Sequence, residues 1–513
     1  MLKNRKMHKK IICVILIFTF LILFFTISCK TPNTPESNSP TAESGSDNGA
    51  ANEADAASQN TTEERVIPDI PETADFGGYE FTILTRGYNN ADWADWNQRD
   101  IVSEGENGEL INDAVWVRNT KIEENYNIKV KESYHPDTFI NDIQKTIKAG
   151  DDTYDIVMPQ TVLTPPLAVQ GLFYNFFTVP YVELDKPWWN QDALRDLSIG
   201  HNLFFMMSDL TVMQNEATSA MVFNKKLLQD YQLESPYDLV KDGKWTFAKM
   251  VEMAKAACSD LDGDGIMDIQ KDQFGIIDQG DSAVAYYLAS GENVVSKNSD
   301  DYPYITFEND RSYSVLTDVL NMLCDTDLGL ELHRYEGKFP IYEFQTQMFS
   351  ENRALFSWIR MRVVETLRSM EADFGIIPLP KYDETQTKYY SQINSHTSVV
   401  ICVPVTASDL NRTGLILEAL SAESKYTLQP AYYELNIRTK FTRDEESLEM
   451  LDIIFGSRVF DMSEIYNFGG FTQEVSKMAR NNKTDFISTY EKLKVKIETD
   501  IAKTIEKYEA LTQ

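Results

Sequence analysis

The sequence predicts an α/β protein with two or more domains. Runs rich in β-forming residues alternate with segments of helical periodicity early in the folded part, and the alternation resumes further along the chain. Strand, helix and strand in this order are typical of a parallel sheet covered by helices. The folded part, from about Ile67 to Gln513, is too long for one hydrophobic core. We therefore expect at least two α/β domains.

The first expected domain opens on a strand at Tyr79–Thr85, which two glycines introduce. A helix over Gly108–Tyr126 has apolar residues near helical spacing, and a short strand, Ile128–Val130, follows it. The next helix, Phe139–Ala149, ends at a glycine and precedes a third strand at Tyr154–Pro159. This order predicts a parallel sheet.

A second α/β segment begins with the strand Met221–Lys225. Helices are expected near Thr246–Ala257 and Arg311–Leu323, where apolar residues again recur at helical spacing. We find no internal repeat, so the two segments are expected to be separate α/β units rather than copies of one.

The N-terminus has the pattern of an export signal. Five Lys or Arg residues precede an apolar run, Ile11–Ile27, that ends just before Ser28 and Cys29. The pattern resembles a bacterial lipobox, in which residues 1–28 are removed and Cys29 carries the lipid. The alternative is an uncleaved signal anchor, because 17 residues can just span a hydrocarbon layer of about 30 Å. Both interpretations place the remaining chain outside the cell.

Residues 29–66 are expected to form a flexible tether behind the lipidated cysteine. The segment 30–65 is almost wholly small or polar and contains no aromatic residue, so it cannot bury enough apolar surface to fold. A coil of this length reaches roughly 30 Å. The expected location is the extracellular face of the bacterial cytoplasmic membrane, with the lipid anchor as the only membrane contact.

The charge and the motif content exclude several functions. The chain has 48 Lys or Arg and 79 Asp or Glu residues, and its net charge of −31 repels phosphate backbones. Nucleic acid is therefore not an expected partner. The sequence contains no Gly-x-Ser-x-Gly, His-Glu-x-x-His or Gly-x-x-x-x-Gly-Lys motif. Apart from Cys29, three cysteines lie outside the signal, at 258, 324 and 402; they have no disulfide spacing, and we expect them to be buried thiols.

Seven short segments in a fixed order give the chain a family resemblance. They are Phe81–Leu84, Tyr154–Val157, Lys186–Trp189, Val222–Lys225, Trp245–Phe247, Phe349–Leu355 and Asp373–Pro380. Over roughly residues 77–405 the chain resembles the family 1 extracellular solute-binding lipoproteins of bacterial ABC importers, most of which carry sugars or oligosaccharides.

The resemblance implies a two-lobed, periplasmic-binding-protein-like (type II) α/β fold with a hinge of several crossing strands. By this analogy residues 77–208 and 350–395 form the N-terminal lobe, and residues 221–345 and 400–513 form the C-terminal lobe. The expected crossings lie near Asp209–Ala220, Glu343–Leu355 and Asn394–Val403. Ligands bind at the carboxyl ends of strands in open α/β sheets, so the two lobes are expected to enclose a cleft.

The function implied is capture of a carbohydrate, in our expectation an oligosaccharide, and its delivery to the permease subunits of an ABC importer. The protein would act as a monomer, break no bond and need no organic cofactor. Two alternatives stay open. One is a binding protein for another solute class, such as peptides, and the other is a tethered secreted glycoside hydrolase.

Candidate ligand contacts follow the first strand and the later expected crossings. A sugar has apolar C–H faces ringed by hydroxyls, so its site needs aromatic platforms together with amide and guanidinium groups. For Trp93 and Trp96, packing on the core is an equal alternative; Trp188 and Trp189 are expected in the core. The candidates are Arg86, Trp93, Trp96, Asn97, Trp358, Arg360, Asn394 and His396.

A run of aspartates predicts a structural Ca²⁺ site that holds a loop in the second lobe. The spacing matches the first three quarters of an EF-hand loop, but Lys271 stands where the last, bidentate Glu belongs. The alternative is an Asp- and Gly-rich turn whose side chains bond their own backbone. The expected ligands are Asp260, Asp262, Asp264, the carbonyl of Ile266, Asp268 and, if the loop runs one residue longer, Asp272.

Overall fold

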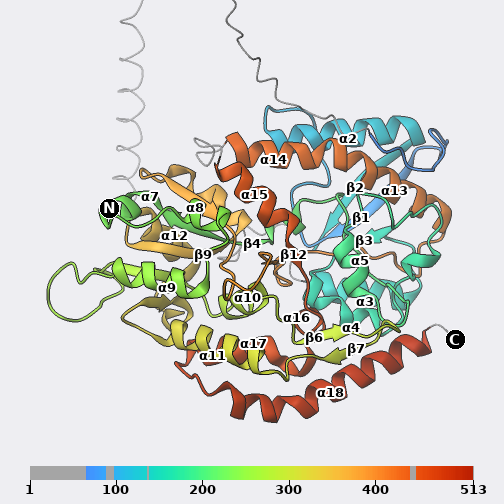
Figure 1. Ribbon diagram of the computed structural model, residues 1–513. Coiled ribbons are helices and arrows are strands. Elements are labelled where there is room, and N and C mark those ends of the chain that lie inside the picture. Colours follow the sequence, from blue (N-terminus) through green and yellow to red (C-terminus); the bar gives the residue numbers. More distant parts are fainter. Residues whose placement is uncertain (1–64, 88–97, 136–137, 439–445, 512–513) are drawn as a thin grey trace, which may run out of the picture. The chain divides into compact units, whose positions relative to one another are not determined.

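The computed structural model describes residues 65–87, 98–135, 138–438 and 446–511 (Figure 1). The expected signal segment, Cys29 and nearly all of the expected tether lie outside these residues. Within the described ranges, every helix is too short or too polar to cross a membrane.

The first sheet has three parallel strands in the order β2-β1-β3. β1 (Tyr79–Thr85) lies between β2 (Ile128–Tyr134) and β3 (Ile156–Val157). Helices α2 (Leu110–Tyr126) and α3 (Phe139–Ala149) connect these strands. The order of strands and helices predicted from the sequence is confirmed here, with β2 longer and β3 shorter than expected.

Helix α3 shows why these predictions succeed. Its buried residues Phe139, Ile143 and Ile147 are spaced four apart, so they form one apolar stripe that packs on the sheet. The helix ends at Gly150, whose φ of 78° gives the left-handed C-cap that glycine adopts without a steric penalty. Both signals are local, and both can be read from the sequence.

The second sheet has five strands in the order β10-β4-β9-β5-β8. They are β4 (Ser219–Asn224), β5 (Phe274–Asp278), β8 (Gly329–Glu331), β9 (Ala354–Arg360) and β10 (Phe374–Ile377). β4 runs antiparallel to both of its neighbours, whereas β5 is parallel to β8 and β9. All seven residues of the central strand β9 are buried, because the sheet is covered on both faces.

Helices pack around the two sheets, and two short strand pairs, β6-β7 and β11-β12, complete the fold (Figure 1). The expected helices near Thr246–Ala257 and Arg311–Leu323 are confirmed as α9 and α11. The remaining elements of the described residues are η2 (Thr161–Leu163), α4 (Pro165–Ala168), η3 (Phe176–Thr178), α5 (Gln191–Leu197), α6 (Met213–Glu216), α7 (Lys225–Asp230), α8 (Pro236–Lys241), α9 (Phe247–Ala256), α10 (Ser282–Ala289), β6 (Val295–Lys297), β7 (Pro303–Ile305), α11 (Asp310–Cys324), η4 (Leu332–Tyr335), α12 (Ile341–Ser350), η5 (Met361–Ser369), β11 (Ser391–Gln392), α13 (Leu410–Tyr426), α14 (Leu428–Arg438), α15 (Glu446–Gly456), β12 (Arg458–Val459), α16 (Met462–Ile465), η7 (Phe468–Gly470), α17 (Phe471–Arg480) and α18 (Phe486–Ala510).

Strand pairing corrects the division into lobes that the sequence predicted. β9 and β10, from the segment 350–395 assigned to the first lobe, pair in the second sheet. Conversely, Ile401 bridges to Met206 and Cys402 to Val157 of β3, which places the start of the segment 400–513 with the first sheet. A short buried strand has the same composition in either sheet, so its sequence does not specify its neighbours.

The chain passes between the two sheets within two of the three expected crossings. It leaves the first sheet after Ser208, which bridges to Trp189, and enters β4 at Ser219. It returns between Ile393, which bridges to Thr218, and Val399, which bridges to Gln160. The segment Glu343–Leu355 is not a crossing, because α12 and β9 both pack within the second sheet region.

Glu418 of α13 ties that helix to the first sheet region. Its two carboxylate oxygens accept hydrogen bonds from the indole nitrogens of Trp188 and Trp189, at 2.9 and 3.0 Å. Burial raises the pKa of Glu418 to about 7, although both indole bonds oppose the shift. Each tryptophan is 1% exposed, so the prediction that both belong to the core is confirmed.

Buried carboxyl groups predict that the folded protein is more stable at mildly acidic pH than at alkaline pH. Burial raises the pKa of Asp278 to about 7 and that of Asp461 to about 6, above their values of about 4 in an unfolded chain. The folded state therefore holds these protons more tightly, and this contribution is complete below pH 4 and is lost as the pH rises through 6 to 7. We expect the temperature of the thermal unfolding midpoint to decrease as the pH is raised from 5 to 8.

Unfolding midpoints of the Asp278→Asn variant over the same pH range distinguish titration of buried carboxyl groups from general charge repulsion. The substitution removes the titrating proton while keeping an oxygen that can accept from the backbone nitrogen of Trp358, so the fall in midpoint is expected to be smaller. Glu252→Gln on the exposed surface of α9 is the charge-matched control. A midpoint that stays level or rises from pH 5 to pH 8 contradicts the prediction.

Candidate ligand-binding cleft

A cavity of about 570 Å³ lies where strands of both sheets end. Arg86 directly follows β1, Arg360 is the last residue of β9, and Asp281 lies three residues after β5. Asn394 and His396 come from the returning crossing. In α/β proteins the carboxyl ends of parallel strands are the usual place for a ligand, because the loops there surround an open crevice. We call this cavity the cleft.

The cleft brings together four of the eight ligand residues that the sequence proposed. Arg86, Arg360, Asn394 and His396 all line it. The segment that contains Trp93, Trp96 and Asn97 lies outside the described residues, so these three stay predictions.

Trp358 does not line the cleft, which differs from the expectation. The residue is 1% exposed, and its backbone nitrogen donates to Asp278 Oδ1 at 2.8 Å while its carbonyl accepts from Gln345 Nε2 at 2.9 Å. Its side chain is enclosed because β9 is the central strand of a sheet covered on both faces. The expectation that Trp358 follows a strand is wrong, because β9 continues to Arg360 and Trp358 lies within it.

Trp358 instead supports the guanidinium group of Arg360. The guanidinium carbon lies 5.0 Å from the centroid of the Trp358 ring and 5.9 Å from that of Tyr342. Contacts at these distances are favourable cation–π interactions, and they restrict the orientation of the charged group. Arg360 Nη2 also donates to Gln279 Oε1 at 3.4 Å. Aromatic side chains thus fix a buried cation at the wall of the cleft.

The turn at Asn394 presents His396 to the cleft. Asn394 Oδ1 accepts from the backbone nitrogens of His396 and Thr397, at 3.2 and 3.1 Å, which is an Asx-type turn. Under the turn, the carboxylate of Glu464 accepts from the backbone nitrogen of Ser395 at 2.9 Å. The side-chain oxygen of Asn394 is therefore used to shape the turn, and His396 is the exposed residue at its tip.

Helix α17 supplies a wall of the cleft that the sequence analysis missed. Five polar residues on one face of this helix line the cavity, while Val475 and Met478 on the opposite face are buried in the core. The amphipathic pattern is visible in the sequence, but nothing local shows where the helix docks. The missed lining residues are Thr472, Gln473, Ser476, Lys477 and Arg480 from α17, together with Gln160, Asp281, Tyr342, Gln392, Thr397 and Glu464.

A second cavity of about 610 Å³ adjoins the cleft and shares Tyr342 with it. Arg99 lines it and pairs with Glu365 of η5 at 2.8 Å and with Glu216 at 3.5 Å. Arg362 pairs with the same Glu216 at 2.6 Å. The two arginines at this cavity are therefore neutralised by Glu365 and by the buried Glu216.

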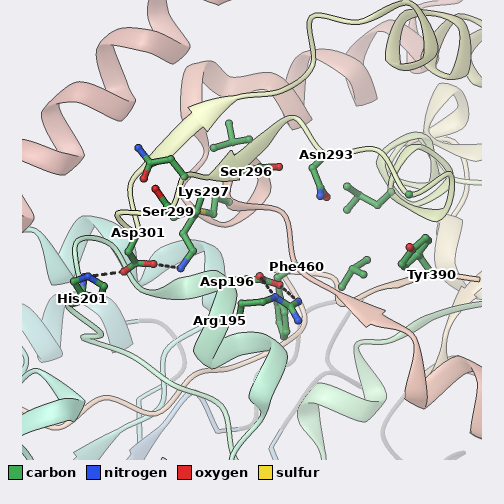
Figure 2. Close-up of a pocket in the computed structure, with 16 residues that line it drawn as sticks. Arg195, Asp196, His201, Asn293, Ser296, Lys297, Ser299, Asp301, Tyr390 and Phe460 are labelled. Carbon is green, nitrogen blue, oxygen red and sulfur yellow. Dashed lines mark hydrogen bonds and ion pairs between the residues drawn. The ribbon is translucent and has the colours of Figure 1, made fainter. Parts of the chain in front are cut away.

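A third cavity, of about 540 Å³, lies beside β6, β7 and α5 (Figure 2). Figure 2 shows its charged side chains in pairs: Arg195 with Asp196 at 2.6 Å, and Lys297 with Asp301, which also accepts from the backbone of His201. None of the described residues proposed as ligand contacts lines it. The cleft, at the strand ends, is the better candidate site.

The aspartate loop brings three of its five proposed carboxylate ligands together. One side-chain oxygen from each of Asp260, Asp262 and Asp264 lies within 4.8 Å of the others. The ammonium group of Lys271 lies 2.8 Å from Asp262, and it neutralises part of this charge. Asp272 is fully buried and accepts backbone hydrogen bonds from Leu261 and Asp268, so its carboxylate supports the loop.

Asp268 does not belong to this group of three carboxylates. Asp268 Oδ1 accepts from the backbone nitrogen of Gln270 at 2.7 Å, and the backbone of Ile266 donates to Asp264 Oδ1 at 2.8 Å. These bonds are those of a turn rich in Asp and Gly. Both the calcium hypothesis and the simple turn therefore remain compatible with the loop.

No protein-family model and no curated protein sequence matches the chain. Comparison with solved structures shows that the chain has a two-lobed, periplasmic-binding-protein-like fold, which a sugar-binding protein of an ABC transporter also has, so the predicted fold class is confirmed. One is the galacto-N-biose-/lacto-N-biose I-binding protein of Bifidobacterium longum (TM-score 0.55, 12% identity, 83% of this chain and 98% of that one). Another is UspC of M. tuberculosis (TM-score 0.52, 12% identity, 82% and 100%). A third is a cyclo/maltodextrin-binding protein in complex with maltotetraose (TM-score 0.50, 12% identity, 88% and 99%).

The calcium hypothesis predicts that metal and Lys271 compete for the aspartates. Extracellular calcium modules bind Ca²⁺ with dissociation constants of about 10⁻⁴–10⁻³ M. Millimolar Ca²⁺ should therefore raise the thermal unfolding midpoint above its value in the presence of a chelator. Lys271→Gln should strengthen this response because it removes the competing cation, whereas Asp262→Asn with Asp264→Asn should abolish it. If wild type and Lys271→Gln both unfold identically with Ca²⁺ and with chelator, the loop is a simple turn.

Proposed function

We propose that this protein is the substrate-binding component of an ABC importer and captures a carbohydrate, in particular an oligosaccharide, in the cleft. The observation that carries the proposal is the cleft itself, which lies at the strand ends of both sheets and is lined by polar groups around one aromatic ring. Its volume, about 570 Å³, falls in the ~300–1,000 Å³ range of small-ligand sites.

The chemistry of the lining supports a polyhydroxylated ligand. Tyr342 offers an aromatic face, and Gln160, His396 and Gln473 offer hydrogen-bonding groups of both polarities. Thr472 Oγ1 is buried at the wall and has no hydrogen-bond partner among the described residues, so a ligand hydroxyl can satisfy it. Two of the compared proteins with this fold were solved in complex with a saccharide, one with lacto-N-biose and one with maltotetraose.

The proposed cycle contains binding and release but no bond cleavage. The two lobes close on the ligand because it contacts both of them, and a permease in the membrane receives the loaded form. The protein works as a monomer in this scheme. Recovery of an oligosaccharide unchanged after long incubation with the protein distinguishes binding from the glycoside hydrolase alternative, which would yield shorter products.

A thermal-shift panel of oligosaccharides, peptides and other solutes tests the ligand class. A ligand at a hundredfold excess over its Kd stabilises the folded state by about 2.7 kcal/mol, which gives a clear rise in midpoint. For an oligosaccharide that binds, Tyr342→Ala should weaken affinity by roughly 1 kcal/mol or more, because the aromatic platform is lost, while Tyr342→Phe should retain it.

Tyr390→Ala in the wall of the third cavity is the matched control and should bind as the wild type does. Stabilisation by peptides but by no saccharide overturns the carbohydrate assignment. Equal affinities for Tyr342→Ala and the wild type would place the ligand outside the cleft.

The proposed location is the extracellular face of the bacterial membrane, where a lipid on Cys29 holds the protein near the permease. The support is the basic and apolar N-terminus that ends at Ser28 and Cys29. Cys29→Ala should block lipidation and processing, so the precursor keeps residues 1–28. Mass spectrometry of membrane-extracted protein measures both changes, and an identical, lipid-free mature mass for wild type and variant contradicts the proposal.

A further inference from the structure

The second cavity continues the cleft and is carried by the same strand ends. Tyr342 lines both cavities, and the loop after β5 borders both, since Gln279 lines the second cavity and Asp281 lines the cleft. Arg360, at the end of β9 and in the wall of the cleft, donates from Nη2 to Gln279 Oε1 at 3.4 Å. The two cavities therefore meet at Tyr342, above the ends of β5 and β9.

Hydrogen bonds fix the border between the two cavities. Gln279 Nε2 donates to Gln345 Oε1 at 2.6 Å. Gln345 Nε2 donates in turn to Ser357 Oγ at 2.8 Å and to the carbonyl of Trp358 at 2.9 Å. Gln279 and Gln345 are only 2% and 6% exposed, and a satisfied network of buried amides is rigid. The floor of the passage beside Tyr342 is therefore preformed.

The second cavity, like the cleft, has walls from both sheet regions. Arg99 lies in the segment between β1 and α2, which belongs to the first sheet region. Its partner at 2.8 Å is Glu365 of η5, the element that directly follows β9 of the second sheet. A ligand in the second cavity therefore contacts both lobes, so its binding favours the closed arrangement.

The second cavity offers groups that match the hydroxyls of a sugar. Its arginines are held by carboxylates of the protein, Arg99 by Glu365 at 2.8 Å and Arg362 by Glu216 at 2.6 Å. Amide and hydroxyl groups both donate and accept hydrogen bonds, as sugar hydroxyls do. Those of α12 and η5 that line the cavity are Thr346, Gln347, Ser350, Thr366 and Ser369.

We propose that the cleft and the second cavity together bind one long, linear oligosaccharide, which passes Tyr342 between them. This inference rests on the proposed function and narrows its substrate class to chains that fill both cavities. Each cavity alone has the volume of a site for one small ligand, about 300–1,000 Å³, and the two together exceed that range. The ring of Tyr342 is the platform on which the middle of the chain stacks.

Isothermal titration calorimetry with oligosaccharides of increasing length tests the inference. The probes are malto-, cello- and xylo-oligosaccharides, each as trisaccharide and as hexasaccharide. In a series that binds, we expect the hexasaccharide to bind at least about tenfold more tightly than the trisaccharide, which is about 1.4 kcal/mol. The gain arises because only the longer chain reaches the hydrogen-bonding groups of the second cavity.

Two variants fill the second cavity while the cleft stays open. Thr366 and Ser369 are exposed residues of η5 that line the second cavity, so a larger side chain there does not disturb the core. Thr366→Trp and Ser369→Trp should each reduce the affinity for the hexasaccharide to about that for the trisaccharide. Ser299→Trp, at an exposed serine of the third cavity, is the matched control and should retain the full tenfold gain.

The outcomes separate this inference from the proposed function. If trisaccharides bind and the hexasaccharides bind no more tightly, the two-cavity site is wrong and carbohydrate capture in the cleft stands. A hexasaccharide gain that is the same in wild type, Thr366→Trp and Ser369→Trp also overturns the inference, because the chain then leaves the cleft by another route. If no saccharide of either length binds, the proposed function and this inference fall together.

Discussion

The hydrogen bonds between the crossing segments are the constraint on which the cleft depends. Thr218 bridges to Ile393, and the backbone nitrogen of Asn394 donates to the carbonyl of Ala217 at 3.0 Å. The carbonyl of Thr218 also accepts from the nitrogen of Met361 at 2.9 Å, directly after β9. Three segments distant in sequence therefore meet at one point. This junction fixes the end of β9, which carries Arg360, beside the turn that presents His396.

Buried carboxylates organise the structure around this junction. Glu464 supports the turn, Glu418 joins α13 to two tryptophans, and Asp278 accepts from the backbone of β9. Each meets donors from segments far away in sequence, so each acts as a cross-link between them. Burial raises the pKa of all three carboxyl groups, because hydrogen bonds only partly replace the lost hydration. A highly acidic chain thus uses some of its carboxylates for internal structure.

Arg360 is a cation that is buried in the wall of the cleft. Aromatic rings from β9 and α12 hold its guanidinium group from two directions. A cation in such a place is both expensive to desolvate and restricted in orientation. Trp358 therefore contributes to the site without touching the cleft, because its ring holds the Arg360 guanidinium group in place.

The sequence by itself determined the local elements and the residues at their ends. The strand Tyr79–Thr85, the helix Phe139–Ala149 and the position of Arg86 directly after the first strand all follow from short-range periodicity and caps. Only the tertiary structure decided that β9 and β10 pair in the second sheet, that Trp358 is enclosed, and that the polar face of α17 lines the cleft. The reason is physical: periodicity tells which face of an element is buried, but the partner that buries it is chosen by long-range packing and hydrogen bonding.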